Sequence, residues 1–486
     1  MRWFGFFLFA ALFLGFATCA QAETKEWGEK INVAPDKTWK IEFNTELERS
    51  SVNDFAVMVE DENEIGYPVT VTLMDDDKTV KVEPETDYLV DTKYTLHIVE
   101  DRIKAKHGKN TIQNKVEMPF YVSKEFQLVT LDSLEDWDFG TSYDSLSEGV
   151  ANAGEGQVII KNGNIFWAPE GSQLVTNAFT IFYTDASLGT SSTYVNGQVE
   201  LNYVRSRSNA IEAELAGKRV FVKPEDVTFI PEDFQKIESD SRPGASYYRN
   251  VNGTLQHTIY RALSNSYVTY SYGKAPDSLG EGEIVTSWDG TTFNGEEATF
   301  FNNLDLRRQG HYNGEMLDEY IASQHPDSPL IGHGDAFVTV AEEQGVNALY
   351  LMAHAIHESA WGKSAIARDK NNLFGIDAVD GNAYDGAMVF ESFEGSIRYL
   401  AEKKLTTEYL VEKGEHFNGY TLGNKSTGMN VKYASDPYWG QKIAGHMYRA
   451  DQYLGGHDQK LLEDENYEVT ERFGEDEENS EEKPEE

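Results

Sequence analysis

The chain has 486 residues, and its 82 Asp and Glu against 42 Lys and Arg give a formal net charge of −40. This length exceeds what one hydrophobic core supports and predicts two to four domains. Nucleic-acid phosphates are bound through cationic contacts, so the charge excludes DNA and RNA as partners.

Part of the acidity lies in the C-terminal residues. Residues 463–486 carry thirteen acidic and two basic side chains, a net charge of −11. This composition predicts an acidic disordered tail. The remaining residues still carry −29 of the total of −40, so acidic folded domains are expected as well.

The first 22 residues, MRWFGFFLFAALFLGFATCAQA, combine one Arg, a short apolar run and a small-residue ending. The pattern predicts a secretory signal at residues 1–22. The run is short for a membrane span and no charged stop-transfer segment follows, so stable membrane insertion is not expected. The single cysteine, Cys19, would leave with the signal, and the mature chain is expected to have no disulfide and no Cys-bound metal.

Six segments between Lys37 and Val122 alternate apolar and polar residues: TWKIEF, FAVMVE, VTVTLM, TVKVEP, YTLHIV and EMPFYV. Asp75–Lys78 separates two of them in the manner of a hairpin turn. So many short strands in about ninety residues predict an antiparallel sandwich. The region at 26–124 resembles the bacterial Ig-like domains of surface proteins.

Strand patterns continue to Phe301, with more aromatic residues and glycines. Asn196–Gly197 and Asn252–Gly253 each interrupt an alternating segment and predict hairpins. Residues 136–238 resemble a bacterial SH3-type wall module, and residues 243–295 resemble the small aromatic β module that precedes the catalytic domain of some wall hydrolases. Their Tyr and Trp rings either stack on sugars or fill small cores.

After Asn302 the apolar residues take a helical period. One face of a predicted helix is formed by Leu349, Met352, Ala353 and Ile356. Glu358 follows on another face, where apolar neighbours are expected to raise its pKa and keep the proton that a general acid must donate. Periodicity alone equally permits an exposed glutamate at a helix end.

A metal site is the alternative at this helix. His354 and His357 precede Glu358 with a spacing that can place two ligands on one face, and His416, His446 or an aspartate could complete the set. The order His-x-x-His-Glu matches neither form of the zinc-protease motif. Packing or hydrogen-bonding histidines are favoured, and neither a metal nor another cofactor is expected.

Three blocks in this region occur in order: HAIHESAWGKSAIARDKNNLFGIDA, FESFEGSI and GNKSTGMNVKYASDPYWGQKIAGHM. They resemble the bacterial autolysin glucosaminidases, glycoside hydrolase family 73, over residues 302–458. The resemblance implies a multidomain protein, in which all-β modules precede a lysozyme-like α+β catalytic domain with a cleft between a helical lobe and a short β lobe.

The resemblance also implies site residues. Glu358 matches the catalytic acid, and Tyr433 matches a tyrosine beside it that could bind the N-acetyl group or hold a water. Asp380 is the expected second carboxylate within residues 375–390. Its competitors are Asp377, Asp385 and Glu391, and the choice between an inverting and a substrate-assisted route stays open.

Further residues of the same blocks are expected to bind substrate: Trp361, Asn372, Phe374, Asp436 and Tyr438. For Trp361 packing is an equal alternative, the NNLFG segment could be only a turn, and Trp439 could belong to the core.

The resulting prediction is a secreted, cell-wall-associated endo-β-N-acetylglucosaminidase of a Gram-positive bacterium. Its partners would be the glycan strands of peptidoglycan, cleaved on the reducing side of N-acetylglucosamine during remodelling or cell separation, and the β modules are candidates for binding wall polymers. The alternatives are a lytic transglycosylase, muramidase-type cleavage, and a non-catalytic wall-binding protein.

Overall fold

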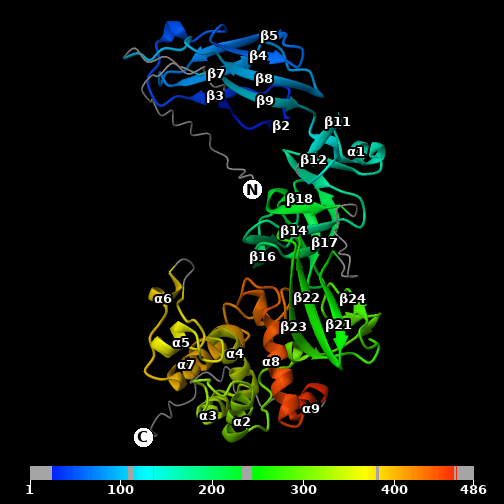
Figure 1. Ribbon diagram of the computed structural model, residues 1–486, viewed down its shortest axis with the longest axis vertical. Helices are drawn as coiled ribbons and strands as arrows, with labels where there is room; N and C mark the ends of the chain where they lie inside the picture. The colour runs from blue at the N-terminus through cyan, green and yellow to red at the C-terminus, as the bar shows by residue number, and fades with distance from the viewer. Residues whose placement is uncertain are drawn as a thin grey trace, which may run out of the picture. The chain divides into compact units, whose positions relative to one another are not determined.

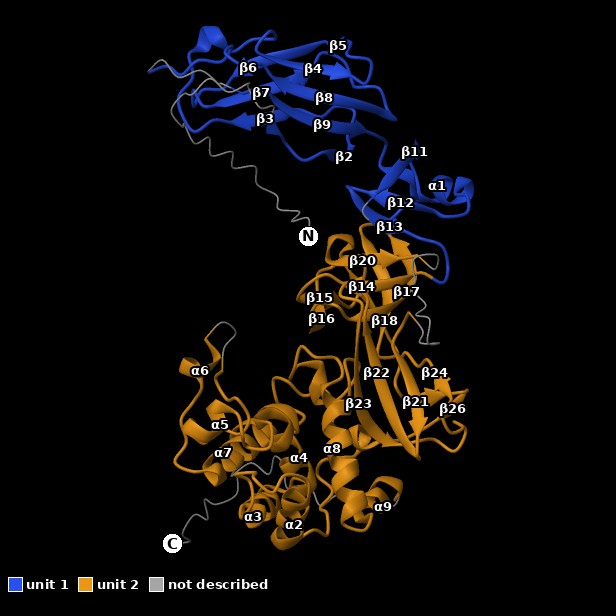
Figure 2. Cartoon of the chain, viewed as in Figure 1, with its two compact units in different colours: residues 1–171 blue, residues 172–486 orange. Residues whose placement is uncertain are grey.

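The structure is a computed structural model that describes residues 25–107, 114–134, 136–231, 244–378, 382–464 and 467. The chain forms two compact units, residues 1–171 and residues 172–486 (Figure 2). The expected signal segment and most of the expected acidic tail lie outside the described residues. None of the helices in the described ranges is long and apolar enough to cross a membrane.

The first unit begins with a sandwich of two sheets (Figure 1). One sheet has the order β1-β9-β8-β4-β5, with β2 paired to β9, and the other has the order β3-β7-β6. The strands are β1 (Lys25–Glu26), β2 (Lys30–Val33), β3 (Trp39–Glu42), β4 (Val57–Asp61), β5 (Gly66–Tyr67), β6 (Val69–Leu73), β7 (Thr79–Pro84), β8 (Thr92–Ile98) and β9 (Val116–Val122).

All six strands expected from alternation are confirmed, because their apolar residues point into one core between the sheets. The turn between β6 and β7 is held by Asp76, whose Oδ1 accepts hydrogen bonds from the backbone N–H groups of Lys78 and Thr79 at 3.0 and 2.8 Å. Aspartate at this place closes the turn with its own side chain, as the sequence predicts.

A smaller sheet completes the first unit. Its order is β11-β10-β12-β13, and helix α1 packs on three of its strands. The elements are β10 (Phe126–Leu131), β11 (Trp137–Tyr143), α1 (Leu146–Asn152), β12 (Gln157–Lys161) and β13 (Asn164–Trp167). A separate small core, which includes Phe126 and Phe166, lies between the helix and the sheet.

The second unit begins with a seven-stranded sheet of order β16-β15-β19-β18-β17-β14-β20. Its strands are β14 (Gln173–Thr176), β15 (Thr180–Tyr183), β16 (Ser191–Val195), β17 (Glu200–Arg207), β18 (Ala210–Leu215), β19 (Lys218–Val222) and β20 (Val227–Ile230). The expected module at 136–238 therefore contributes strands to two sheets, one in each unit. Its SH3-type character and the domain boundaries stay predictions.

The two Asn-Gly predictions have different outcomes. Asn252 and Gly253 both have positive φ and join β21 to β22 in a two-residue hairpin with Val251 opposite Thr254. The hairpin expected at Asn196–Gly197 is wrong, because β16 and β17 are not neighbours in their sheet. There the Asn196 N–H bonds to the carbonyl oxygen of Ser435, so a tertiary contact replaces the local strand pair.

A four-stranded sheet of order β23-β22-β21-β24 and the helical domain follow. The strands of this sheet are β21 (Tyr247–Val251), β22 (Thr254–Arg261), β23 (Ser266–Lys274) and β24 (Ile284–Val285), and β25 (Thr292–Phe293) and β26 (Glu296–Glu297) form a separate two-stranded sheet. The helices are α2 (Gly314–Gln324), α3 (Gly334–Gln344), α4 (Ala348–Ser359), α5 (Ala365–Lys370), α6 (Ala383–Gly386), α7 (Phe393–Tyr399), a π-helix (Leu400–Tyr409), α8 (Trp439–Tyr453) and α9 (His457–Glu463).

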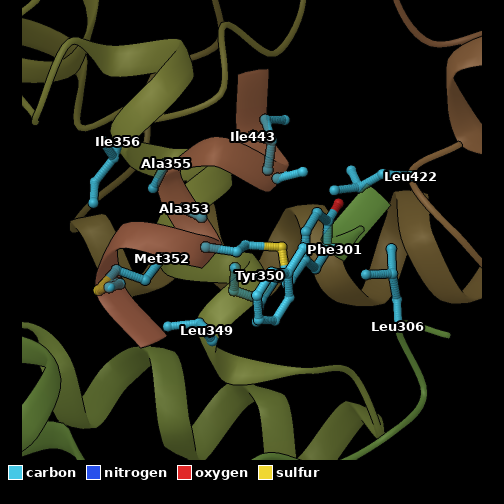
Figure 3. Close-up of a cluster of buried hydrophobic side chains, with 14 of the residues drawn as sticks. Phe301, Leu306, Leu349, Tyr350, Met352, Ala353, Ala355, Ile356, Leu422 and Ile443 are labelled. Carbon is cyan, nitrogen blue, oxygen red and sulfur yellow. The ribbon is translucent and has the colours of Figure 1, made fainter. Parts of the chain in front are cut away.

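The four-stranded sheet and the helices share one hydrophobic core. It extends from Tyr248 and Tyr272 of the sheet to the residues of α4 and α8, and Figure 3 shows its central part. Helix α4 is buried on every side between Leu349 and Ile356. The sequence predicts only one buried apolar face, so the buried surface of the helix is larger than expected. A central helix needs apolar residues around its whole circumference.

The segment expected to form a short β lobe has a different structure from the one predicted. The described residues of 375–390 contain α6 and turns but no strand. The segment has three Gly and three Asp and lacks alternating β-branched residues, so its composition does not favour a β ladder. Its turns are fixed by Lys370, whose Nζ donates to the carbonyl oxygens of Asp385 and Ala387 at 3.2 and 2.9 Å.

Candidate active site

The C-terminus of α4 fixes the position of Glu358. The helix starts at the cap residue Asn347, whose side chain accepts the Tyr350 N–H at 2.8 Å. It ends at Ser359, and the next three residues, Ala360 to Gly362, all have positive φ, which turns the chain sharply away. Glu358 thus lies in the last turn of a buried helix, with the backbone on both sides of it fixed.

Two side chains approach the same carboxylate oxygen of Glu358. The indole Nε1 of Trp439 donates a hydrogen bond to Oε1 at 2.7 Å. Nε2 of His354, one helical turn before Glu358, lies 3.7 Å from that oxygen. Trp439 is 2% exposed and His354 is fully buried, whereas the side chain of Glu358 is 28% exposed. The Glu358 carboxylate is therefore in contact with buried side chains on one side and exposed to solvent on the other.

The expected rise in the pKa of Glu358 is wrong for the unliganded protein. Burial acts to raise the pKa, but His354, the Trp439 N–H and His357 together outweigh it and leave the pKa below its usual value. Apolar neighbours alone would raise the pKa, but an indole donor and imidazoles near the carboxylate favour its ionised form.

Glu358 opens into a pocket of about 490 Å³. The lining residues come from α4, from α8 and the loop before it, and from β16 and the turns next to β15 and β16: Phe179, Tyr194, Asn196, His357, Glu358, Tyr433, Ala434, Ser435, Asp436 and Trp439. The ring of Tyr433 stacks on Trp439 with 4.5 Å between ring centroids. Aromatic faces beside a carboxylate and polar groups suit a sugar ring, which has both apolar faces and hydroxyl edges.

Strand β16 supports the loop that carries Tyr433. The Thr193 hydroxyl donates to the carbonyl oxygen of Val431 and the Tyr194 hydroxyl donates to that of Lys432, both at 2.7 Å. Beneath the same loop Lys425 donates to the carbonyl oxygen of Ala434, and burial lowers the pKa of Lys425 to about 7. The loop is thus fixed by groups from the β sheet as well as from its own domain.

Helix α8 carries Trp439 and rests on the four-stranded sheet. Gly445 approaches the sheet so closely that a Cβ there would lie 1.9 Å from the carbonyl oxygen of Ser271. Gln441 joins a buried network, in which its Oε1 accepts from the Tyr270 hydroxyl at 2.6 Å and lies 3.0 Å from His257 Nδ1. These contacts with the sheet therefore fix the position of α8 and, with it, the position of the Trp439 indole.

The structure brings three of the expected site residues together. Glu358, Tyr433 and Asp436 line the same pocket. Asp436 also accepts from the Tyr438 N–H at 2.9 Å and forms an ion pair with Lys442. Asp380 lies outside the described residues, so its place relative to Glu358 stays a prediction.

Four other expected substrate-binding residues do not line the Glu358 pocket: Trp361, Asn372, Phe374 and Tyr438. Asn372 is 1% exposed, and its amide donates to the carbonyl oxygens of Ile376 and Met388, which ties the turn after α5 together. Phe374 packs against the His354 ring at 5.1 Å and Trp361 against the His325 ring at 4.3 Å. Their positions favour the packing alternatives stated above.

Several residues of the pocket were missed. Tyr194 lies in β16, Asn196 follows that strand and Phe179 precedes β15, and no sequence signal connects them to Glu358. Trp439 was noted only as a possible core residue, although its position after YASDPY was a usable signal. Within the described ranges, no group of three or more His, Cys, Asp and Glu side chains could hold a metal ion.

Comparison with known proteins gives two family matches. Residues 334–452 match the glucosaminidase model, described as mannosyl-glycoprotein endo-β-N-acetylglucosaminidase, and residues 28–123 match a bacterial Ig-like domain. A putative endo-β-N-acetylglucosaminidase of Streptococcus pneumoniae is 36% identical over 231 residues, which are 47% of this chain and 33% of that protein. The match thus spans about a third of the relative's length.

Two more distant similarities were found. A β-N-acetylglucosaminidase of Bacillus subtilis is 26% identical over 197 residues, covering 36% of this chain and 21% of that protein. The crystal structure of Staphylococcus aureus autolysin E has 21% identity and a TM-score of 0.26, covering 36% of this chain and 83% of that chain. From the family matches, the chain is multidomain, with a glucosaminidase domain at residues 334–452 and a bacterial Ig-like domain at residues 28–123.

Proposed function

We propose that the chain is a secreted peptidoglycan hydrolase in which Glu358 is the general acid. The observation that carries the proposal is the placement of this carboxylate at the end of a buried helix, facing a pocket with stacked aromatic rings and hydrogen-bonded by the Trp439 indole. The bond cleaved would be the β-1,4 bond on the reducing side of N-acetylglucosamine, and the relatives' names, which describe β-N-acetylglucosaminidases, support cleavage at this sugar.

In this mechanism Glu358 donates its proton to the glycosidic oxygen as the bond to the anomeric carbon breaks. The unliganded carboxylate favours ionisation. A sugar that fills the pocket would displace water from the exposed side of Glu358 and shift the balance toward the protonated form, because desolvation penalises the charge. Trp439 would keep the carboxyl oriented throughout.

Tyr433 is proposed to bind the N-acetyl group or the attacking water. Its ring is fixed by stacking on Trp439 and lies 5.3 Å from that of His354, which supports a defined position for its hydroxyl. Asp380 stays the proposed second carboxylate, acting either as the base for a water or as the group that stabilises an attacking N-acetyl. Wall polymers remain the proposed ligands of the β modules, and a Gram-positive cell wall the proposed location.

Products of cleavage test the proposal. Purified cell walls digested with the full chain should release fragments that end in reducing N-acetylglucosamine, detected by mass spectrometry before and after borohydride reduction. Fragments ending in anhydro-muramic acid would indicate a lytic transglycosylase, and reducing N-acetylmuramic acid would indicate muramidase-type cleavage. Either result would contradict the proposed bond, while the absence of any fragment would favour a non-catalytic wall-binding protein.

A further inference from the structure

A second cavity, of about 60 Å³, lies within the unit of residues 172–486. It has no lining residue in common with the Glu358 pocket. The segment 436–439 separates the two, since Pro437 and Tyr438 line the second cavity while Asp436 and Trp439 line the Glu358 pocket. The other walls of the second cavity come from the seven-stranded and four-stranded sheets and their loops, from residues 286–290 after β24, from Asn424, and from Gln441 of α8.

The charged groups of this cavity are all acidic. Glu200, Glu214 and Asp289 line it, and none of the described residues in its wall is Lys or Arg. Asp289 is held ionised by the turn that follows it, because hydrogen bonds from Thr291 and Thr292 outweigh burial and lower its pKa to about 2. His257 adds no positive charge, since burial lowers its pKa to about 3. The wall is therefore complementary to a cation.

Glu200, one of the lining residues, has a carboxylate oxygen without a hydrogen-bond partner among the described residues. Its side chain is 5% exposed, and Oε2 accepts the backbone N–H of Ser246 at 2.9 Å. Oε1 is buried and has no hydrogen-bond partner among the described residues. Burial raises the pKa of Glu200 to about 7. A carboxylate withdrawn from water without a cationic partner is costly, so a ligand that donates to Oε1 would remove that cost.

The aromatic residues and the size of the cavity indicate which kind of cation could bind there. Tyr248, Trp288 and Tyr438 line the cavity, and aromatic faces attract cations. The volume of about 60 Å³ is several times the roughly 10–15 Å³ that one water needs. The cavity thus has room for a methylene and an ammonium group with its N–H donors.

We infer that this cavity binds a primary ammonium group, with Glu200 Oε1 accepting one of its N–H donors and the aromatic residues flanking its charge. The site does not depend on glycan cleavage and goes beyond the proposed hydrolase function. Two sources share this chemistry: a free small amine, and the side-chain amine of a peptide. A quaternary ammonium has the same charge but no N–H to donate, so it is expected to bind weakly.

Binding of methylammonium to the full chain tests this inference. Isothermal titration at pH 8 should give saturable binding that is at least about tenfold weaker in Glu200→Gln, while Glu225→Gln, an exposed change in the same unit, should bind as the wild type does. Tetramethylammonium and potassium at equal ionic strength should not reproduce the effect. Equal binding by Glu200→Gln, by potassium or by tetramethylammonium would overturn the site, as would no binding at all.

A second ligand distinguishes the two sources. Nα-acetyl-lysine amide carries the same ammonium on a peptide-like side chain. Binding of both ligands supports a site open to peptide amines, and binding of methylammonium alone supports a site for free small amines. Trp288→Ala, at the partly exposed rim, provides a variant that keeps Glu200 and should weaken methylammonium binding if the indole flanks the cation.

Discussion

The protonation of Glu358 is decided by a few atoms around one carboxylate oxygen. Burial favours the neutral acid, whereas His354, the Trp439 indole and His357 favour the anion, and the second set prevails. In the proposed mechanism Glu358 must be protonated when it reacts, so the fraction of competent enzyme is expected to fall as the pH rises through the pKa of Glu358. The hydrogen bond from Trp439 therefore fixes the position of the Glu358 carboxyl group, but it also lowers the pKa of that group.

Trp439→Phe should shift the pH dependence of activity. The phenyl ring keeps the packing but cannot donate to Oε1, so the pKa of Glu358 should rise toward the value that burial favours. The alkaline limb of the profile of kcat/KM on purified walls should move to higher pH than in the wild type. Trp167→Phe, in the other unit, should leave the limb in place, and an unmoved limb in Trp439→Phe would show that the indole does not control this proton.

Asp380→Asn tests the proposed second carboxylate. If Asp380 serves as the base or stabilises the N-acetyl group, turnover should fall by more than about tenfold with little change in wall binding. Asp377→Asn and Glu391→Gln should stay active in the same assay of released reducing ends. An inactive Glu391→Gln beside an active Asp380→Asn would transfer the role to Glu391 and leave that of Glu358 untouched.

Single residues show where sequence reasoning reaches its limit. Glu358 and Tyr433 were predicted from motif blocks, and both line the pocket. The Trp439 contact joins residues 81 positions apart, and Phe179 lies just before β15, a strand that no pattern connects to α4. Local periodicity carries no information about such pairs, because they form only when elements distant in the sequence pack together.

At the scale of elements, α8 connects the four-stranded sheet to the pocket. Its first residue donates to Glu358, and Gly445 in its middle touches the backbone of β23. Strand β16 supports the preceding loop through Thr193 and Tyr194. The β elements of this unit thus have a structural role in the site, whatever polymers they bind.

Gly445→Ala should disturb this connection. The new methyl group would collide with the carbonyl oxygen of Ser271, and such overpacking costs about 1–3 kcal/mol of unfolding free energy. Since α8 must shift and Trp439 moves with it, turnover should fall by roughly tenfold to a hundredfold. Urea unfolding and wall lysis measure the two effects. Gln452→Ala, on the exposed side of α8, should change neither, and a fully active Gly445→Ala would refute the coupling.

The strands of the sandwich were predicted well because alternation is a local signal that survives packing on one face. The hairpin at Asn252–Gly253 was predicted for the same reason, since a two-residue turn is determined by its own residues. Asn196–Gly197 has the same dipeptide, but its backbone bonds to Ser435 and the strands beside it pair elsewhere. Propensity there is overridden by a contact 239 positions away along the chain.

At the scale of the whole molecule, the net charge of −40 opposes an anionic substrate. Walls rich in anionic polymers should repel the chain in dilute buffer, and salt shortens the reach of that repulsion from about 10 Å at 0.1 M to about 3 Å at 1 M. The structure also indicates where the tail can be shortened, because Arg308 and Gln309 contact Tyr467.

Wall binding and lysis should therefore strengthen with added salt over part of this range. Truncation after Tyr467 removes acidic residues but keeps the contact with Arg308, and it should ease the low-salt defect. Sedimentation of the enzyme with purified walls, and lysis rates across a salt series, measure both. A monotonic fall with salt would show that cationic patches dominate and would contradict the repulsion.

The central claim is that one carboxyl group, Glu358, donates the proton in glycan cleavage. The most direct test is the turnover of Glu358→Gln on purified walls, measured as reducing ends released per enzyme, beside the exposed control Glu315→Gln on α2. The amide keeps the shape but has no acid proton, so turnover should fall by roughly 100- to 10,000-fold, with unchanged circular dichroism and melting temperature, while the control matches the wild type. A folded Glu358→Gln protein that keeps more than about half of the wild-type turnover would contradict the account.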